Sequence, residues 1–247
     1  DLFQGQHRNT MTCRNKAKKQ PDGTSGCGHR NIKFEPFMYL SLPISSKSFT
    51  LDECLDLFCM EEPLVGENQW YCPNCKTHVD ATKKFDLWIL PPILIVHLKR
   101  FDYSGHKIEK PIYYPVQNWD LSRAVQSKSG LCPLFDLYAV SNHVGGLGGG
   151  HYTAFVKNRF DEGWYEMNDS RTRKLDAKTE VGGNPSAYCL FYNRVDRDTQ
   201  GDRKRSDPKV MRQSVDRPEL WPHMQVMSDF RSFRRSKFAM DLSNIKE

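Results

Sequence analysis

Residues 148–154 read Gly-Gly-Gly-His-Tyr-Thr-Ala, and this run restricts what the second half of the chain can form. Glycine loses the most backbone freedom on folding, so three in succession are unfavourable inside a helix. The aromatic and β-branched residues that follow favour a strand. We therefore predict a mobile glycine loop at residues 145–150 that leads into a strand at 151–158, with His151 at the hinge between them.

Most other segments with a regular apolar pattern are short and are bounded by Gly or Pro, which is typical of strands. We predict strands at residues 34–42, 83–90, 93–101, 134–142, 163–168 and 186–193, and extended chain at 111–121. Residues 50–60 have a helical pattern in which Thr50 and Glu53 have the spacing of a capping box, and we expect Pro63 to close this helix. The predicted fold class is α+β, predominantly β.

The strand predicted at 163–168 ends in groups that can orient an imidazole. Residues 164–170 read Trp-Tyr-Glu-Met-Asn-Asp-Ser, which places an amide and a carboxylate side by side. A histidine oriented by Asn or Asp forms two thirds of a triad that activates a nucleophile. The candidate catalytic residues are therefore His151, Asn168 and Asp169, and the nucleophile is the missing member.

The cysteines indicate a metal site. Cys72-Pro-Asn-Cys75 is a turn that aims two thiolates at one point, and Zn²⁺ in a structural site takes four ligands. Cys13 and Cys27 are the natural second pair, because the entropy of closing the longer loop between them grows only slowly with its length. We predict a structural zinc site at Cys13, Cys27, Cys72 and Cys75. His29 in place of Cys13 is one alternative, and buried cysteines without metal are another.

The remaining cysteines are not predicted to be nucleophiles. None has an adjacent base or a helix N-terminus in its sequence surroundings, as a reactive thiolate generally needs; they are Cys54, Cys59, Cys132 and Cys189. The chain shows no secretory signal, so we expect reduced thiols and an intracellular protein, cytoplasmic or nuclear. No apolar run approaches the roughly 18 residues of a membrane span, and none is expected.

Two polar segments interrupt the pattern. Residues 14–26 are rich in Lys, Gly and Ser, which predicts a flexible insertion between Cys13 and Cys27. Residues 197–247 carry twelve Lys and Arg against eight Asp and Glu, and they contribute much of the net charge of +6. We predict a basic, disordered tail over 196–247, in which residues 220–242 are either an amphipathic docking segment or unstructured chain.

Taken in order, several motifs resemble the ubiquitin-specific proteases, which are papain-like cysteine deubiquitinases. The resemblance covers roughly residues 1–195. The matching stretches are residues 2–6 (LFQGQ), 34–37 (FEPF), 40–43 (LSLP), 71–75 (YCPNC), 90–101 (LPPILIVHLKRF), 141–143 (SNH), 149–154 (GGHYTA), 164–165 (WY), 168–170 (NDS), 187–188 (AY) and 190–192 (LFY).

The resemblance implies a hand-like fold, with fingers and a zinc ribbon at about residues 2–90 and a β-rich palm at about 90–195. It also implies ubiquitin and ubiquitinated proteins as partners. His151 would be the general base, Asn168 the third triad member, and Asp169 a neighbour that shares its role. A channel for the Gly-Gly tail of ubiquitin needs walls without bulky side chains, which favours Gly149 and Gly150, with His143 and Tyr152 beside them, as substrate-binding residues.

Two departures from the family pattern matter. The nucleophile of the family lies in a box of the form Gly-Asn-Thr-Cys at the start of a thumb helix, and no such box occurs here. We therefore expect a catalytic domain without its thumb, which is inactive alone. The insertion at residues 14–26 also replaces a short knuckle of the family, which bears on zinc binding rather than on the fold.

The function predicted from the resemblance is hydrolysis of thioester, ester or isopeptide bonds at the C-terminal glycine of ubiquitin. The alternative is a ubiquitin-binding module without chemistry. A third interpretation, a zinc-ribbon nucleic-acid protein, has the Cys72–Cys75 pair and the basic tail in its favour. The ribbon region lacks the interleaved aromatic and basic residues typical of single-strand binders, so no specific nucleic acid is expected.

Overall fold

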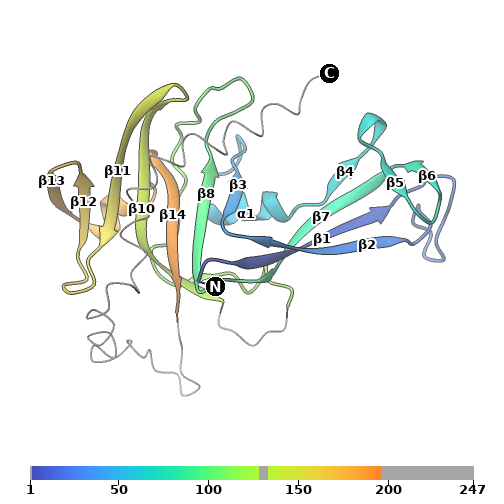
Figure 1. Ribbon diagram of the computed structural model, residues 1–247, viewed down its shortest axis with the longest axis horizontal. Coiled ribbons are helices and arrows are strands. Elements are labelled where there is room, and N and C mark those ends of the chain that lie inside the picture. Colours follow the sequence, from blue (N-terminus) through green and yellow to red (C-terminus); the bar gives the residue numbers. More distant parts are fainter. Residues whose placement is uncertain (1, 128–132, 196–247) are drawn as a thin grey trace, which may run out of the picture. The chain divides into compact units, whose positions relative to one another are not determined.

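The computed structural model describes residues 2–127 and 133–195, and this part of the chain is mostly β-sheet (Figure 1). The predicted fold class is confirmed. The predicted tail at 196–247 and Cys132 lie outside the described residues. Within the described part, no helix is long and apolar enough to cross a membrane.

The smaller sheet has four antiparallel strands in the order β2-β1-β7-β4. Its strands are β1 (Gly5–Cys13), β2 (Arg30–Phe37), β4 (Glu62–Leu64) and β7 (Ala81–Ile89). A short helical turn, η1 (Gly66–Asn68), leads from β4 to a two-stranded hairpin of β5 (Trp70–Cys72) and β6 (Thr77–Val79). This hairpin is the tight turn predicted around Cys72 and Cys75.

The larger sheet has the order β13-β12-β11-β10-β14-β8-β3, with β9 paired to β10. Only β3 and β8 are parallel among its described pairs. Its strands are β3 (Leu40–Pro43), β8 (Ile93–Lys99), β9 (Trp119–Asp120), β10 (Leu134–Gly146), β11 (Gly149–Lys157), β12 (Trp164–Asn168), β13 (Arg171–Leu175) and β14 (Ala187–Arg194). A turn of π-helix, η2 (Ala177–Val181), connects β13 to β14.

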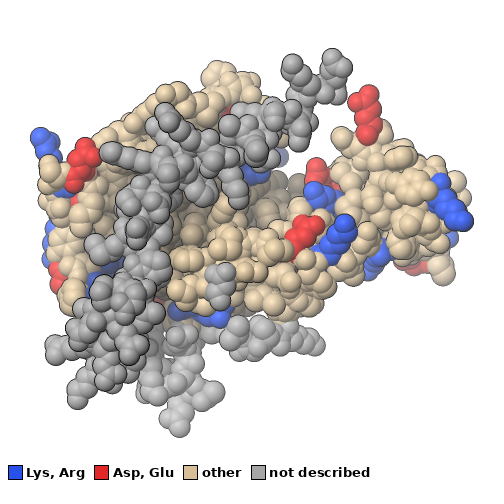
Figure 2. Space-filling model, in the orientation of Figure 1, with Lys and Arg blue, Asp and Glu red and all other residues tan. Residues whose placement is uncertain are grey.

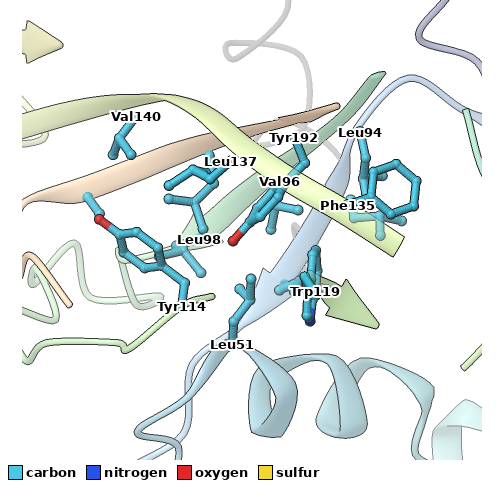
Figure 3. Close-up of a cluster of buried hydrophobic side chains, with 14 of the residues drawn as sticks. Leu51, Leu94, Val96, Leu98, Tyr114, Trp119, Phe135, Leu137, Val140 and Tyr192 are labelled. Atoms are coloured by element: carbon cyan, nitrogen blue, oxygen red, sulfur yellow. The ribbon is translucent and has the colours of Figure 1, made fainter. Parts of the chain in front are cut away.

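The main core lies between one face of the larger sheet and the helix α1 (Leu51–Cys59), as Figure 3 shows. Alternate residues of β8 point into it, as expected for a strand with one buried face. The cluster in the figure includes Leu51 of α1, Leu94, Val96 and Leu98 of β8, Phe135, Leu137 and Val140 of β10, Tyr192 of β14, and Tyr114 and Trp119. A second, smaller cluster surrounds Cys13, Cys72 and Val79.

The capping box of α1 is confirmed. The Thr50 side chain accepts from the Glu53 backbone N–H at 3.2 Å, and the Glu53 carboxylate accepts from the Thr50 N–H at 2.8 Å. The prediction that Pro63 closes the helix is wrong, because the chain turns extended at Met60 and Pro63 lies in β4.

Two predictions, the strand at 34–42 and the loop at 145–150, need correction. The strand predicted at 34–42 is two strands in different sheets, β2 and β3, separated at Met38 and Tyr39. The chain predicted to be extended at 111–121 contains the short β9 and a bridge from Tyr113 to Thr50. The glycine loop predicted at 145–150 is a hairpin, since β10 and β11 continue through Gly146 and Gly149 and leave a two-residue turn.

Acidic and basic side chains are interspersed on the face of the described part that Figure 2 shows. This face therefore shows no dominant cluster of basic side chains of the kind that attracts nucleic acid.

Candidate functional site

Neighbouring strands bring His151 and Asn168 together. His151 lies in β11 and Asn168 is the last residue of β12, and the two strands are antiparallel. Their register pairs Ala154 with Met167, and one further step places Thr153 opposite Asn168. His151 lies two residues from Thr153 on the same face of the sheet, so its side chain reaches Asn168 diagonally.

The hydrogen bond between these residues fixes the state of the ring. Nε2 of His151 lies 2.7 Å from Oδ1 of Asn168. An amide oxygen only accepts, so Nε2 carries the proton and donates it. In the neutral ring Nδ1 is then an unprotonated acceptor. The side chain of His151 is 51% exposed, so the ring is open to solvent.

Asp169 is less well placed. Its Oδ2 lies 3.9 Å from Nε2 of His151, and its side chain is 81% exposed. Asp169 has a φ of 50° in the two-residue turn between β12 and β13. At this distance and exposure the carboxylate attracts an imidazolium only through solvent-screened charge, and it does not hold the ring as the Asn168 amide does.

The predicted substrate-binding residues lie near the turn of the β10–β11 hairpin. Gly149 and Gly150 are exposed in β11, and a Cβ on Gly149 would meet nothing within 4 Å. A Cβ on Gly150 would lie 2.3 Å from the Val144 carbonyl oxygen and 2.5 Å from Nε2 of His143. Glycine is therefore required at Gly150 by the packing of the hairpin itself, and only Gly149 borders open space.

His143 is buried and sits in a cluster of rings. Its ring centroid lies 4.6 Å from that of Tyr152, 5.7 Å from Tyr188 and 6.0 Å from Phe101. It is 3% exposed, whereas Tyr152 is 44% exposed. Of this predicted pair, Tyr152 is the residue that an incoming chain can touch. The buried ring of His143 packs against the ring of Tyr152 and supports it.

The four predicted metal ligands come together at the end of the smaller sheet. The Sγ atoms of Cys13, Cys27, Cys72 and Cys75 all lie within 4.8 Å of one another. Four sulfurs at about 2.3 Å from one tetrahedral Zn²⁺ are about 3.8 Å apart. The Sγ atoms of Cys13 and Cys75 are 3.8 Å apart, and those of Cys27 and Cys72 are 3.7 Å apart, so this cluster fits the ion. His29 lies outside the cluster and stacks on Trp70 instead.

Local backbone geometry presents these thiols. Cys13 ends β1, and the turn between Cys72 and Cys75 is closed by a bond from the Lys76 N–H to the Cys72 carbonyl. Gly26 has a φ of 128° and its Cβ would meet the Cys13 carbonyl at 2.1 Å, so only glycine allows this approach. The insertion predicted to be flexible is folded between these points, with a bridge between Lys19 and Ser25.

The surroundings of Cys27 favour a thiolate. Burial disfavours the charge, but donors from the Asn74 side chain and the His29 backbone outweigh it and lower the pKa of Cys27 to about 6. Burial raises the pKa of Cys72 to about 11. Asn15 also donates from Nδ2 to Sγ of Cys75 at 3.5 Å. Amide donors to sulfur are the outer partners typical of a metal–thiolate site.

The other described cysteines are not activated. Burial raises the pKa of Cys54, and it raises the pKa of Cys59 to about 11 and that of Cys189 to about 12. A thiol becomes a nucleophile when its pKa is lowered. The nucleophile that would complete the His151–Asn168 pair is therefore not one of these three residues.

Sequence reasoning missed the buried side chain of Asn142, which is 1% exposed in β10. It lies opposite Thr153 and next to His143. The only signal for it was its place in the motif Ser-Asn-His at residues 141–143, where a short amide in a strand is unusual.

Comparison with known proteins identifies relatives of most of the described part. Residues 1–192 match the family described as "Ubiquitin carboxyl-terminal hydrolase". The chain is 48% identical over 157 residues to Ubiquitin carboxyl-terminal hydrolase 10 of Arabidopsis thaliana, and 43% identical over 173 residues to Ubiquitin carboxyl-terminal hydrolase 15 of Homo sapiens. These matches cover 62% and 68% of this chain but 17% and 16% of those relatives.

The fold is also similar to solved structures. One is the SAGA Ubp8/Sgf11/Sus1/Sgf73 DUB module bound to ubiquitin aldehyde, with a TM-score of 0.64 and 26% identity over 80% of this chain and 42% of that chain. A second structure of the SAGA DUB module, bound to monoubiquitin, matches with the same TM-score of 0.64.

Proposed function

The chain belongs to the ubiquitin carboxyl-terminal hydrolase family, and we propose that it supplies the general base of a cysteine-type deubiquitinase. The substrate bond is the thioester, ester or isopeptide bond at the C-terminal glycine of ubiquitin. The observation that carries the proposal is the 2.7 Å bond from Nε2 of His151 to Oδ1 of Asn168, because it leaves Nδ1 as an unprotonated base.

The geometry supports a two-step acyl transfer. Nδ1 of His151 takes the proton of a thiol, and the thiolate attacks the glycine carbonyl carbon. The imidazolium then protonates the departing amine, which leaves a thioester on the cysteine. Water is deprotonated by the same Nδ1 and attacks the thioester, which releases the carboxylate and returns the thiol. Asn168 accepts from Nε2–H throughout and keeps the ring in one orientation.

The thiol itself is proposed to lie outside the described residues. Four of the seven described cysteines form the sulfur cluster, and burial raises the pKa of the other three. Cys132 of this chain also lies outside the described residues, but its sequence surroundings offer no base and no helix N-terminus. We therefore expect the chain alone to bind ubiquitin without hydrolysing it. A permanently inactive ubiquitin-binding module is the competing function, and the experiment below separates the two.

The cysteine cluster is proposed to hold one structural Zn²⁺. The two sulfur–sulfur distances of 3.7 and 3.8 Å support this. Bound there, the ion would cross-link β1, the insertion and the β5–β6 hairpin. Four protein ligands leave no position for a catalytic water, so its role would be structural.

The test compares this chain with a longer protein in which it follows a cysteine-containing segment of the family type. The measurement is release of a fluorophore from the C-terminus of ubiquitin. We expect no release by the chain alone and turnover by the longer protein. In that protein His151→Ala should lower kcat by a factor of at least about 10², whereas His78→Ala, which changes an exposed histidine of β6, should leave kcat unchanged.

Two results would contradict the proposal. Full activity of the longer protein with His151→Ala would show that another group is the base. Tight ubiquitin binding by the longer protein without any turnover would favour the binding module.

A further inference from the structure

A row of polar side chains crosses three strands beside the imidazole. Asn142 of β10 lies opposite Thr153 of β11. The last pair of β11 with β12 is Ala154 with Met167, and one further step along both strands places Asn168 beside Thr153. Residues directly opposite one another in antiparallel strands share a face, so the three side chains lie on the face that carries His151. Nδ2 of Asn142 donates to Oγ1 of Thr153 at 3.4 Å.

Asn142 is in turn held from behind by the loop that precedes β14. Nδ2 of Asn184 donates to Oδ1 of Asn142 at 2.9 Å, and the Ser186 N–H donates to Oδ1 of Asn184 at 2.9 Å. The His143 N–H donates to the Ser186 carbonyl at 2.8 Å. A buried amide with its carbonyl oxygen satisfied has one favoured orientation, so the donor side of Asn142 is directed at Thr153.

The same contacts fix a bulge in β14. Ser141 pairs with Cys189 but Asn142 pairs with Ala187, so Tyr188 is an extra residue on that strand. The fully buried Arg100 donates from Nε to the Ala187 carbonyl at 2.5 Å, which anchors the bulge from the other side. Bulges beside active sites commonly re-aim a side chain. Here the ring of the bulged Tyr188 contacts the rings of His143 and Tyr152. Tyr152 directly follows His151 in the sequence.

We propose that Asn142 is a positioning residue for the base: through Thr153 it sets the place of β11 against β12, and so the aim of the His151 ring at Asn168. This inference rests on the proposed role of His151. Asn142 does not contact His151, so its effect passes through the strand. Its removal would leave the Asn184 amide and the Thr153 hydroxyl without their buried partner and allow β11 to shift.

The experiment measures the ring nitrogens of ¹⁵N-labelled histidines by NMR in the complete chain, at a pH about two units above the ordinary imidazole pKa. In the unsubstituted protein we expect the Nε2–H form of His151 to dominate. Asn168→Ala, which removes the acceptor, gives the reference shifts for a ring that is free to change tautomer. We expect Asn142→Ala to move the His151 shifts at least halfway to that reference.

The controls separate positioning from general destabilisation. Thr153→Val should reproduce the shift with a smaller structural change, and Thr153→Ser, which keeps the hydroxyl, should restore the unsubstituted spectrum. Asn193→Ala, at an exposed position of β14, should change nothing. The ring shifts of His7, bonded to Glu35 in the smaller sheet, should stay constant in every variant.

The outcomes are decisive in each direction. If Asn142→Ala and Thr153→Val lower the melting temperature but leave the His151 shifts unchanged, Asn142 is structural only and the inference is overturned. If Asn168→Ala itself leaves the His151 shifts unchanged, the His151–Asn168 pair is not formed and the proposed function falls with the inference. Neither measurement requires turnover, so a missing nucleophile does not obscure the result.

Discussion

At the scale of single residues, Asn168 and Asp169 are neighbours with different contacts. Asn168 bonds Nε2 of His151 at 2.7 Å, while Asp169 lies 3.9 Å from it and is mostly exposed. Solvent screening weakens the second interaction.

In the longer, active protein we predict that Asn168→Ala lowers kcat by about 10²-fold or more, since orientation of the base is lost. Asp169→Ala should lower kcat less than about tenfold. Steady-state hydrolysis of a ubiquitin–fluorophore conjugate gives both values, and the reverse order of effects would make Asp169 the orienting group.

The pKa of His97, in β8, is shifted by burial. Its Nδ1 lies 2.8 Å from Oγ of Ser41, and its ring lies edge-on to Tyr188. Burial, followed by the nearby charge of Lys99, lowers the pKa of His97 to about 4. The folded protein therefore keeps this ring neutral at a pH where the unfolded chain protonates it.

This difference predicts a loss of stability in acid. The unfolded state gains a proton below the ordinary pKa of about 6.5, so the free energy of unfolding falls as the pH drops from there towards 4, by about 2 kcal/mol between about pH 7 and about pH 5. Urea unfolding at the two pH values measures it. His97→Asn, which keeps a partner for Ser41 but does not titrate, should show a pH dependence smaller by that amount. Equal dependence in both proteins would argue that His97 titrates normally.

At the scale of elements, the β10–β11 hairpin explains why the glycine run is not a loop. A Cβ on Gly145 would lie 2.6 Å from Cα of Gly150, so the two strands pair here only because both positions lack side chains. Glycine-rich sequence normally indicates a turn. Strands that pair closely through glycines have no alternating apolar residues, so their sequence does not identify them as strands.

The hairpin yields a matched pair of variants. Gly150→Ala should destabilise the fold by roughly 1–3 kcal/mol, since its Cβ would overlap the Val144 carbonyl and the His143 ring. Gly149→Ala should cost much less, because its Cβ meets nothing within 4 Å. Chemical unfolding of the two variants tests this directly. Similar losses for both would indicate that chain flexibility, not overlap, decides the choice of glycine.

Sequence patterns located some elements and not others, for physical reasons. The capping box located α1, and the run Ile93–Val96 located β8, because each carries a local signal. The strand β1 was missed because its polar residues are half exposed in a thin sheet with few buried positions. The strand β13 was also missed. Its sequence, Arg-Thr-Arg-Lys-Leu, is mostly charged, which is tolerated because the strand lies at a sheet edge.

Some residues of the candidate sites could likewise be predicted from the sequence and others could not. The spacing of His151 from Asn168 and the cysteine pairs were visible in the sequence, because their chemistry requires particular residue types. Asn142 was not, since its partners Thr153 and Asn184 are brought to it only by the register of three strands.

At the scale of the whole described part, the sulfur cluster and the main core are separate. Cys13, Cys72 and Val79 form their own small cluster, while α1 and the larger sheet share the other. Loss of the metal should therefore loosen the end of the smaller sheet and leave the larger sheet folded.

We predict that Cys75→Ser lowers the zinc content of the purified protein from about one ion per chain to near zero. In the same variant, amide hydrogen exchange should speed up in residues 13–27 and 70–79 but not in β8, β10 or β14. Cys59→Ser, at a half-buried cysteine of α1 outside the cluster, is the matched control. Zinc content that persists in Cys75→Ser would mean that this thiol is not a ligand.

The strands β1 and β7 have nine residues each and run antiparallel from the main core to the sulfur cluster. At about 3.3 Å per residue, such a strand is roughly 30 Å long, and the register of the pair shifts between Gln6 and His7, at the end far from the cysteines. A change at the cysteine end therefore reaches the main core along these paired strands and not by direct contact, since the two buried clusters share no residue.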